Sequence, residues 1–176
     1  MKKTLIILLA VLSLVLVSCE TTSASDIPDA SMETTLEPSF GHDYTSNITY
    51  KFICDFAQEL KGDEKSITVT KDDKSRTVTI EGYKLDVLVG PMAQDGVADI
   101  TFTLKAEGNK ASCTIHYVNS FGTISLGPIS KQMAMGITSA GIDFYNVQVE
   151  TLLNLFDSAM QSYAFQYAYE NGWMDG

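Results

Sequence analysis

The segment DITFTLKAEGNKASCTIHYV, residues 99–118, contains the pattern that decides the fold class. Apolar and polar side chains alternate along it on both sides of residues 107–110, which have the composition of a tight turn. A period of two is typical of a strand that buries one face and exposes the other. We therefore predict two antiparallel strands, at 100–106 and 111–117, joined by a short turn.

A helix is predicted upstream of this strand pair, over residues 48–60. Asn47 is a candidate N-cap, and Lys61 followed by Gly62 is typical of a helix end. Apolar residues recur at every fourth position on one face of this helix, namely Ile48, Phe52, Phe56 and Leu60.

After that helix, the period of the apolar residues changes from about four to two. Residues 66–70 and 78–80 alternate in polarity on either side of the charged turn 71–74, which predicts another strand pair. The alternation slips by one residue at Gly82, so we expect a β-bulge or a strand break there.

The C-terminal part of the chain predicts a long helix over residues 144–170. Residues 119–141 are rich in Gly and Ser and show no clear period. Within them, only residues 133–135 are assigned, to a short helical turn. The order of helix, strands and helix predicts an α+β domain. We expect an antiparallel sheet of about four strands, with both helices packed on one face. The core stripe of the long helix is predicted at Leu152, Phe156, Ala159, Met160, Tyr163 and Tyr167.

Residues 48–118 resemble a domain of unknown function that is common in envelope proteins of Bacteroidetes. The resemblance depends on the segments FICDFAQEL, ITVT, TVTIEGY and the quoted strand pair, and its most specific feature is the Ile-x-Gly at residues 80–82. It implies a TATA-binding-protein-like fold, in which a helix precedes a curved antiparallel sheet and a second helix. A similar unit occurs in a lipoprotein of the outer-membrane assembly machinery. The conserved chemistry of the family is unknown, so the resemblance implies no catalytic residue.

The N-terminus has the features of a bacterial lipoprotein signal peptide. A basic start at residues 1–3 precedes an apolar run at 4–18, which is short for a membrane span but suits a signal peptide. The run ends in Leu16-Val17-Ser18-Cys19, which looks like a lipobox. This resemblance implies that residues 1–18 are removed and that two or three acyl chains on Cys19 anchor the chain to a membrane. An ordinary signal peptide or an uncleaved anchor is the alternative.

Residues 19–46 are predicted to be the lipidated cysteine followed by a disordered tether. Residues 20–47 contain ten Ser or Thr, six Asp or Glu, and no Lys or Arg. A segment with so few apolar side chains is typical of a solvated spacer. A single folded domain is then expected at 47–176. We place the protein in the bacterial cell envelope, with the domain outside the cytoplasm and the outer membrane favoured over the inner one.

Charge and motif content exclude several classes of function. With 12 Lys and Arg against 22 Asp and Glu, the net charge of −10 disfavours nucleic acid as a partner. His42 is assigned to the tether and His116 to the exposed face of a strand, and neither has a second His or Cys at metal-ligand spacing. No Gly-x-Ser-x-Gly elbow and no glycine-rich phosphate loop with a lysine is present. We therefore expect no enzymatic activity, no metal and no cofactor.

Two features of the sequence leave alternatives open. Once Cys19 is lipidated, Cys54 and Cys113 either form a disulfide bond or remain buried free thiols. Aromatic residues recur every fourth position at Phe165, Tyr169 and Trp173, on a helical face distinct from the predicted core stripe. These aromatic side chains either pack under the first helix or form an exposed surface that binds a partner.

The leading functional hypothesis is a membrane-anchored envelope lipoprotein without catalytic activity. Its domain is expected to bind another envelope protein or to act as a scaffold. The alternative is a lipoprotein that carries a small apolar ligand between its sheet and its helices.

Overall fold

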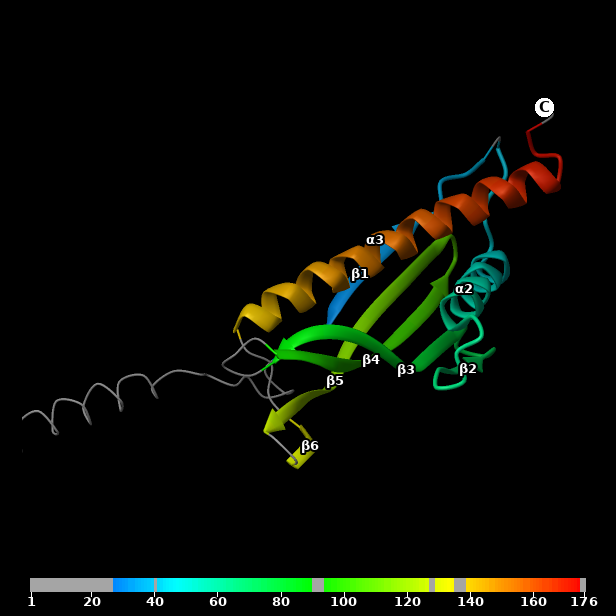
Figure 1. Ribbon diagram of the computed structural model, residues 1–176. Coiled ribbons are helices and arrows are strands. Elements are labelled where there is room, and N and C mark those ends of the chain that lie inside the picture. The colour runs from blue at the N-terminus through cyan, green and yellow to red at the C-terminus, as the bar shows by residue number, and fades with distance from the viewer. Residues whose placement is uncertain (1–26, 40, 90–93, 127–128, 135–138, 175–176) are drawn as a thin grey trace, which may run out of the picture.

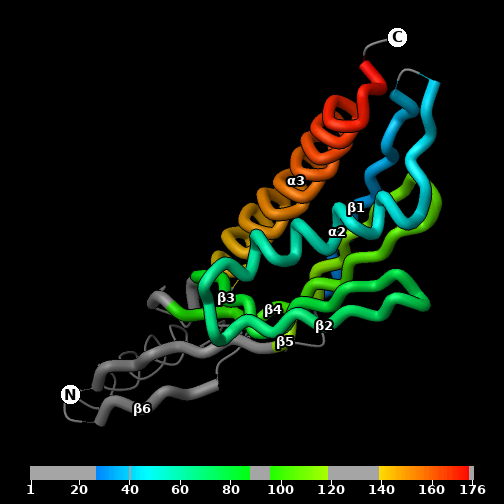
Figure 2. Tube along the Cα trace, turned by 90° about the vertical axis from the view of Figure 1, so that its right-hand side faces the viewer, coloured from blue at the N-terminus to red at the C-terminus, as the bar shows by residue number. Residues whose placement is uncertain are grey.

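The computed structural model describes residues 27–39, 41–89, 94–126, 129–134 and 139–174. Figure 1 shows the long helix α3 lying across a curved sheet, with α2 beside it, and Figure 2 shows both helices from the side. The elements are, in chain order, β1 (Ala30–Thr35), α2 (Ser46–Lys61), β2 (Thr68–Asp72), β3 (Thr77–Val89), β4 (Gln94–Glu107), β5 (Lys110–Leu126), β6 (Ile129–Ala134) and α3 (Ser139–Glu170).

The strands form one antiparallel sheet in the order β1-β5-β4-β3-β2, and β6 also pairs with β5. The predicted turn is present, because Glu107 of β4 pairs with Lys110 of β5. Strand β1 pairs with residues 110–115 of β5 and β6 pairs with residues 121–126, so both lie along the same edge of β5. The predicted α+β class is confirmed, while the sheet has six strands instead of about four.

Helix α2 begins two residues earlier than the sequence pattern suggests. Its N-cap is Thr45, whose side-chain oxygen accepts a hydrogen bond from the backbone N–H of Ile48 at 3.4 Å. Asn47, the predicted N-cap, lies inside the helix, where its side-chain oxygen accepts two hydrogen bonds from the Arg76 guanidinium. Lys61 is the last helical residue and Gly62 follows with a φ of +49°, so the predicted C-terminus is confirmed.

The predicted slip at Gly82 is a β-bulge. Ile80 pairs with Phe102 and Tyr83 pairs with Ile100, so two residues of β3 stand opposite one residue of β4. Gly82 has a φ of +80°, a conformation that L-residues with a side chain rarely adopt. After the bulge, Leu85 and Val87 lie on the buried face.

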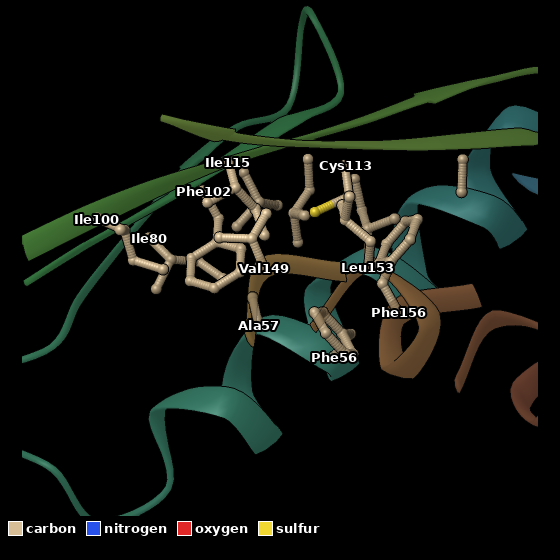
Figure 3. Close-up of a cluster of buried hydrophobic side chains, with 14 of the residues drawn as sticks. Phe56, Ala57, Ile80, Ile100, Phe102, Cys113, Ile115, Val149, Leu153 and Phe156 are labelled. Carbon is tan, nitrogen blue, oxygen red and sulfur yellow. The ribbon is translucent and has the colours of Figure 1, made fainter. Parts of the chain in front are cut away.

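The core lies between the inner face of the sheet and the two helices. In Figure 3, Phe102 and Ile115 of the sheet face Val149 and Phe156 of α3 and Phe56 of α2. The opposite face of the sheet carries side chains such as Thr103, Lys105 and His116, which are exposed. Both helices therefore cover a single face, as predicted.

The face that α3 buries is rotated relative to the predicted stripe. Phe156 and Met160 are buried as predicted, whereas Leu152, Ala159, Tyr163 and Tyr167 are half-buried at the border of that face. The buried face runs the length of the helix and includes two alanines. Its residues are Gly141, Tyr145, Val149, Leu153, Phe156, Met160, Ala164 and Ala168.

The predicted tether is wrong for the part of it that the structure describes. Residues 30–35 form β1, and Leu36 is fully buried. Thr34, which is 3% exposed, donates a hydrogen bond of 2.7 Å to the Asp157 carboxylate of α3. The reason is a period-two pattern, in which Met32, Thr34 and Leu36 alternate with the more exposed polar residues of this segment. The folded domain therefore includes residues upstream of 47.

Two other predictions concern the segment at 133–135 and the N-terminus. Met133 and Ala134 belong to β6 and not to a helical turn, because they pair with Gly122 and Phe121 of β5. Residues 1–26, which include Cys19, lie outside the described residues, so the signal peptide and the lipid attachment stay predictions.

Candidate functional site

The outer side of α3 carries a continuous line of exposed side chains without charge. We call this line the α3 stripe. At 3.6 residues per turn, its members lie within an arc of about 80° on the helix surface, opposite the buried face. The α3 stripe consists of Phe144, Val147, Thr151, Leu155, Ser158, Ser162, Phe165 and Tyr169, all of which are exposed.

The apolar members of the α3 stripe expose much of their surface. Phe165 and Tyr169 are 62% and 71% exposed, and Phe144, Val147 and Leu155 are 43%, 62% and 52% exposed. These five large apolar side chains share one face of the helix, with a pair near each end and Leu155 between the pairs. Exposed apolar side chains on a shared face are typical of an interaction surface.

The charged residues of α3 lie beside the α3 stripe and are all acidic. They are Asp143, Glu150, Asp157 and Glu170, and the helix contains no Lys or Arg.

Within the described ranges, no helix is both long and apolar enough to cross a bilayer.

The structure separates Trp173 from the two aromatic residues with which the sequence groups it. Helix α3 ends at Glu170, and Gly172 with a φ of +68° turns the chain back. The Trp173 ring then stacks on His42 at a centroid distance of 4.7 Å and contacts Tyr44 and Tyr167 at 5.4 and 5.3 Å. Trp173 is therefore half-buried against the domain, while Phe165 and Tyr169 are exposed.

The cluster around Trp173 fixes the segment before α2 to the end of α3. The Tyr44 hydroxyl is buried and donates a hydrogen bond of 2.8 Å to the backbone carbonyl of Ala164. His42, assigned by its sequence context to the tether, is held here by its ring contact with Trp173. The ring contacts and the Tyr44 hydrogen bond together indicate a structural role for this cluster.

A groove of about 380 Å³ lies between α2 and α3. Aromatic rings of Phe52, Tyr163 and Tyr167 line it together with the carboxylates of Asp55, Glu59 and Glu170. The Tyr163 hydroxyl is buried and has no hydrogen-bond partner among the described residues. Burial first, and the nearby Glu59 carboxylate second, raise the pKa of Tyr163 above its usual range. Lys51 also lines the groove and forms an ion pair with Asp55, so this charged lining suits a polar ligand better than an apolar one.

His116 lies on the exposed sheet face, as predicted, and has a carboxylate partner. Its Nδ1 atom is within hydrogen-bonding distance of Asp29, and the two side chains are 59% and 51% exposed. In the described part of the chain, no hydroxyl or thiol is hydrogen-bonded to this pair, and no group of three or more His, Cys, Asp or Glu side chains is arranged to hold a metal ion. Among the described residues, the pair is therefore not joined to a nucleophile in the way that a hydrolytic triad requires.

Cys54 and Cys113 are both free thiols, so the alternative of a disulfide bond is not realised in this structure. Cys113 is fully buried on the inner face of β5, as Figure 3 shows. Burial raises the pKa of its thiol to about 12, which keeps it protonated and unreactive near neutral pH.

Three apolar members of the α3 stripe were not predicted as site residues from the sequence, namely Phe144, Val147 and Leu155. The signal that reveals them is a second helical period in the same segment, with uncharged residues spaced by three or four from 144 to 169. A helix with two apolar faces looks like a buried helix, so this second period is easily assigned to the core.

The fold is similar to two solved structures from Bacteroidetes. One is a TBP-like protein from Parabacteroides distasonis ATCC 8503, with a TM-score of 0.57 and 12% identity over 79% of this chain and 98% of that chain. The other is a DUF4468 family protein from Bacteroides ovatus ATCC 8483, with a TM-score of 0.51 and 9% identity over 82% and 92%. No family model and no curated protein matches the chain. At these identities the similarity supports the TBP-like fold that the sequence resemblance implied, and nothing about activity.

Proposed function

We propose that the chain is a lipid-anchored protein of the bacterial cell envelope whose domain binds another protein. The observation that carries this proposal is the α3 stripe, an uncharged and largely apolar face with no covering element in the described structure. The lipobox-like sequence ending at Cys19 supports the anchor. A membrane-anchored domain with an exposed apolar face suits a role in assembly or scaffolding better than one in catalysis.

Phe165 and Tyr169 are the most exposed aromatic side chains of the α3 stripe. Their exposed fractions of 62% and 71% correspond to about 120–140 Å² each. Burying that area against a partner contributes about 3 kcal/mol per side chain before the entropic cost of association is subtracted. Aromatic residues with this much free surface are the ones that dominate protein interfaces.

Cross-linking in native membranes tests the proposal. The full-length protein is expected to retain a specific envelope protein, and Cys19→Ala is expected to lose it by releasing the domain from the membrane. Phe165→Ser with Tyr169→Ser is expected to abolish the cross-link while the protein remains folded. Asn146→Ser, at an exposed α3 position outside the α3 stripe, is the matched control. Retention of the partner by the double variant would contradict the proposed surface.

The alternative of an apolar ligand receives no specific support from the structure. The groove between α2 and α3 is lined by the charged side chains of Lys51, Asp55, Glu59 and Glu170, which an apolar molecule would desolvate.

A further inference from the structure

The α3 stripe is symmetrical about a midpoint between Phe156 and Asp157. A two-fold axis that lies between two copies at the level of this midpoint, perpendicular to both helices, therefore places the stripe of one copy against the stripe of the other. Such self-complementarity is what an isologous interface requires. The positions that are equidistant from the midpoint, to within one residue, are Phe144 with Tyr169, Val147 with Phe165, Thr151 with Ser162, and Leu155 with Ser158.

We propose that the α3 stripe is the interface of a homodimer in which the α3 helices of two copies pack antiparallel. The inference rests on the proposed function in one respect, namely that this face binds a protein, and it names a second copy of the chain as that protein.

Side-chain sizes favour the antiparallel arrangement. At the centre, Leu155 of each copy lies opposite Ser158 of the other, so a large side chain fills the space left by a small one. At each end, Phe144 lies opposite Tyr169 and forms an aromatic pair. A parallel pair would instead place Ser158 opposite Ser158 and Ser162 opposite Ser162, leaving the middle of the interface poorly filled.

The available area is close to what a stable dimer needs. The stripe is about 38 Å long from residue 144 to residue 169, at a rise of about 1.5 Å per residue. The five apolar members are 43–71% exposed and together offer on the order of 500 Å² per copy. The serine and threonine members and the adjoining helix surface extend this toward the roughly 800 Å² per partner of a standard interface.

The charge distribution distinguishes a second copy from a basic partner helix. The acidic residues of α3 lie off the stripe, so a basic helix lying on the stripe would not meet them along its contact line. Two copies with a net charge of −10 each repel one another at long range, and salt screens that repulsion. The homodimer should therefore tighten as ionic strength rises, whereas a complex with a basic protein would weaken.

Sedimentation velocity of the purified full-length chain in detergent tests the dimer. The expected particle contains two copies and dissociates less at higher salt. Leu155→Glu is expected to raise the dissociation constant about tenfold or more, because each dimer then buries two carboxylates. Asn146→Glu adds the same charge at an exposed α3 position outside the stripe, and is expected to stay within about twofold of the parent. Far-UV circular dichroism confirms that both variants are folded.

Disulfide cross-linking tests the orientation. In a Cys54→Ala background, chains with Phe144→Cys mixed with chains carrying Tyr169→Cys are expected to form a disulfide between copies. Cys113 stays out of the reaction because it is buried. Efficient cross-linking of the Phe144→Cys chain with itself would indicate a parallel pair and overturn the antiparallel geometry.

The dimer and the proposed function fail in different experiments. A chain that is monomeric at every concentration and salt overturns the dimer. If that monomer still cross-links to a different protein through Phe165 and Tyr169 in native membranes, the proposed function stands. A dimer that Leu155→Glu leaves intact also overturns the inference, because two copies would then associate through another face.

Discussion

The β-bulge at Gly82 makes a quantitative prediction about stability. A Cβ atom at this position would lie 2.4 Å from the backbone carbonyl oxygen of Ser66 and 3.8 Å from the Cα of Ile67. The close atom belongs to the backbone, so it cannot move aside as the end of a flexible side chain would. We expect Gly82→Ala to lower the free energy of unfolding by about 2–4 kcal/mol. About 1–2 kcal/mol of this comes from the φ of +80°, and the rest from displacing the chain before β2.

Gly41 provides a matched control for the conformational part of that cost. Its φ is +81°, but a Cβ atom there would meet nothing within 4 Å. Gly41→Ala is therefore expected to cost only the conformational part, about 1–2 kcal/mol. Urea denaturation followed by circular dichroism measures both variants, provided that the slope of the transition is unchanged. If Gly82→Ala and Gly41→Ala were equally destabilising, the steric argument for the bulge would be refuted.

Three further predictions follow from burial. Leu36→Ala is expected to lower the free energy of unfolding by about 2–5 kcal/mol because Leu36 is fully buried, while Glu37→Ala at the exposed neighbour is expected to be neutral. Equal urea midpoints for the two variants would mean that this segment is a tether. Burial raises the pKa of Cys113 from 9.0 to about 12, so the unfolded chain releases this proton first as pH rises. The contribution of the buried thiol to stability is therefore complete below pH 9, and above pH 9 it falls by about 1.4 kcal/mol per pH unit. Urea titrations at pH 7 and 10 measure this loss of stability, which Cys113→Ala is expected to reduce. Trp173→Ala is expected to cost about 1–3 kcal/mol and Tyr169→Ala less than about 0.5 kcal/mol, and the reverse order in thermal unfolding would contradict the assigned burial.

The elements that the sequence predicted correctly are those whose pattern is local. Helix α2, the hairpin of β4 and β5, and α3 each carry a strong period of apolar residues. The slip at Gly82 was predictable for the same reason, because a change of phase within one strand is visible in the chain itself.

The elements that the sequence did not reveal depend on partners far away in the chain. Strand β1 lies in a segment with the composition of a tether, and it is ordered by pairing with β5 and by the hydrogen bond from Thr34 to Asp157. Trp173 continues the spacing of Phe165 and Tyr169, but the turn at Gly172 removes it from their face. Neither outcome can be derived from the residues within a few positions of these side chains.

The sequence by itself determined the α+β class, the order of the main elements and the expected N-terminal address at Cys19. These properties depend on local periodicity and on a short contiguous motif, which a linear chain displays directly. Only the tertiary structure decided which face of α3 is buried and which is free. A helix with apolar residues on two sides is ambiguous until the sheet covers one of them. The opposite face of α3 packs against the sheet and α2, and the α3 stripe therefore stays exposed.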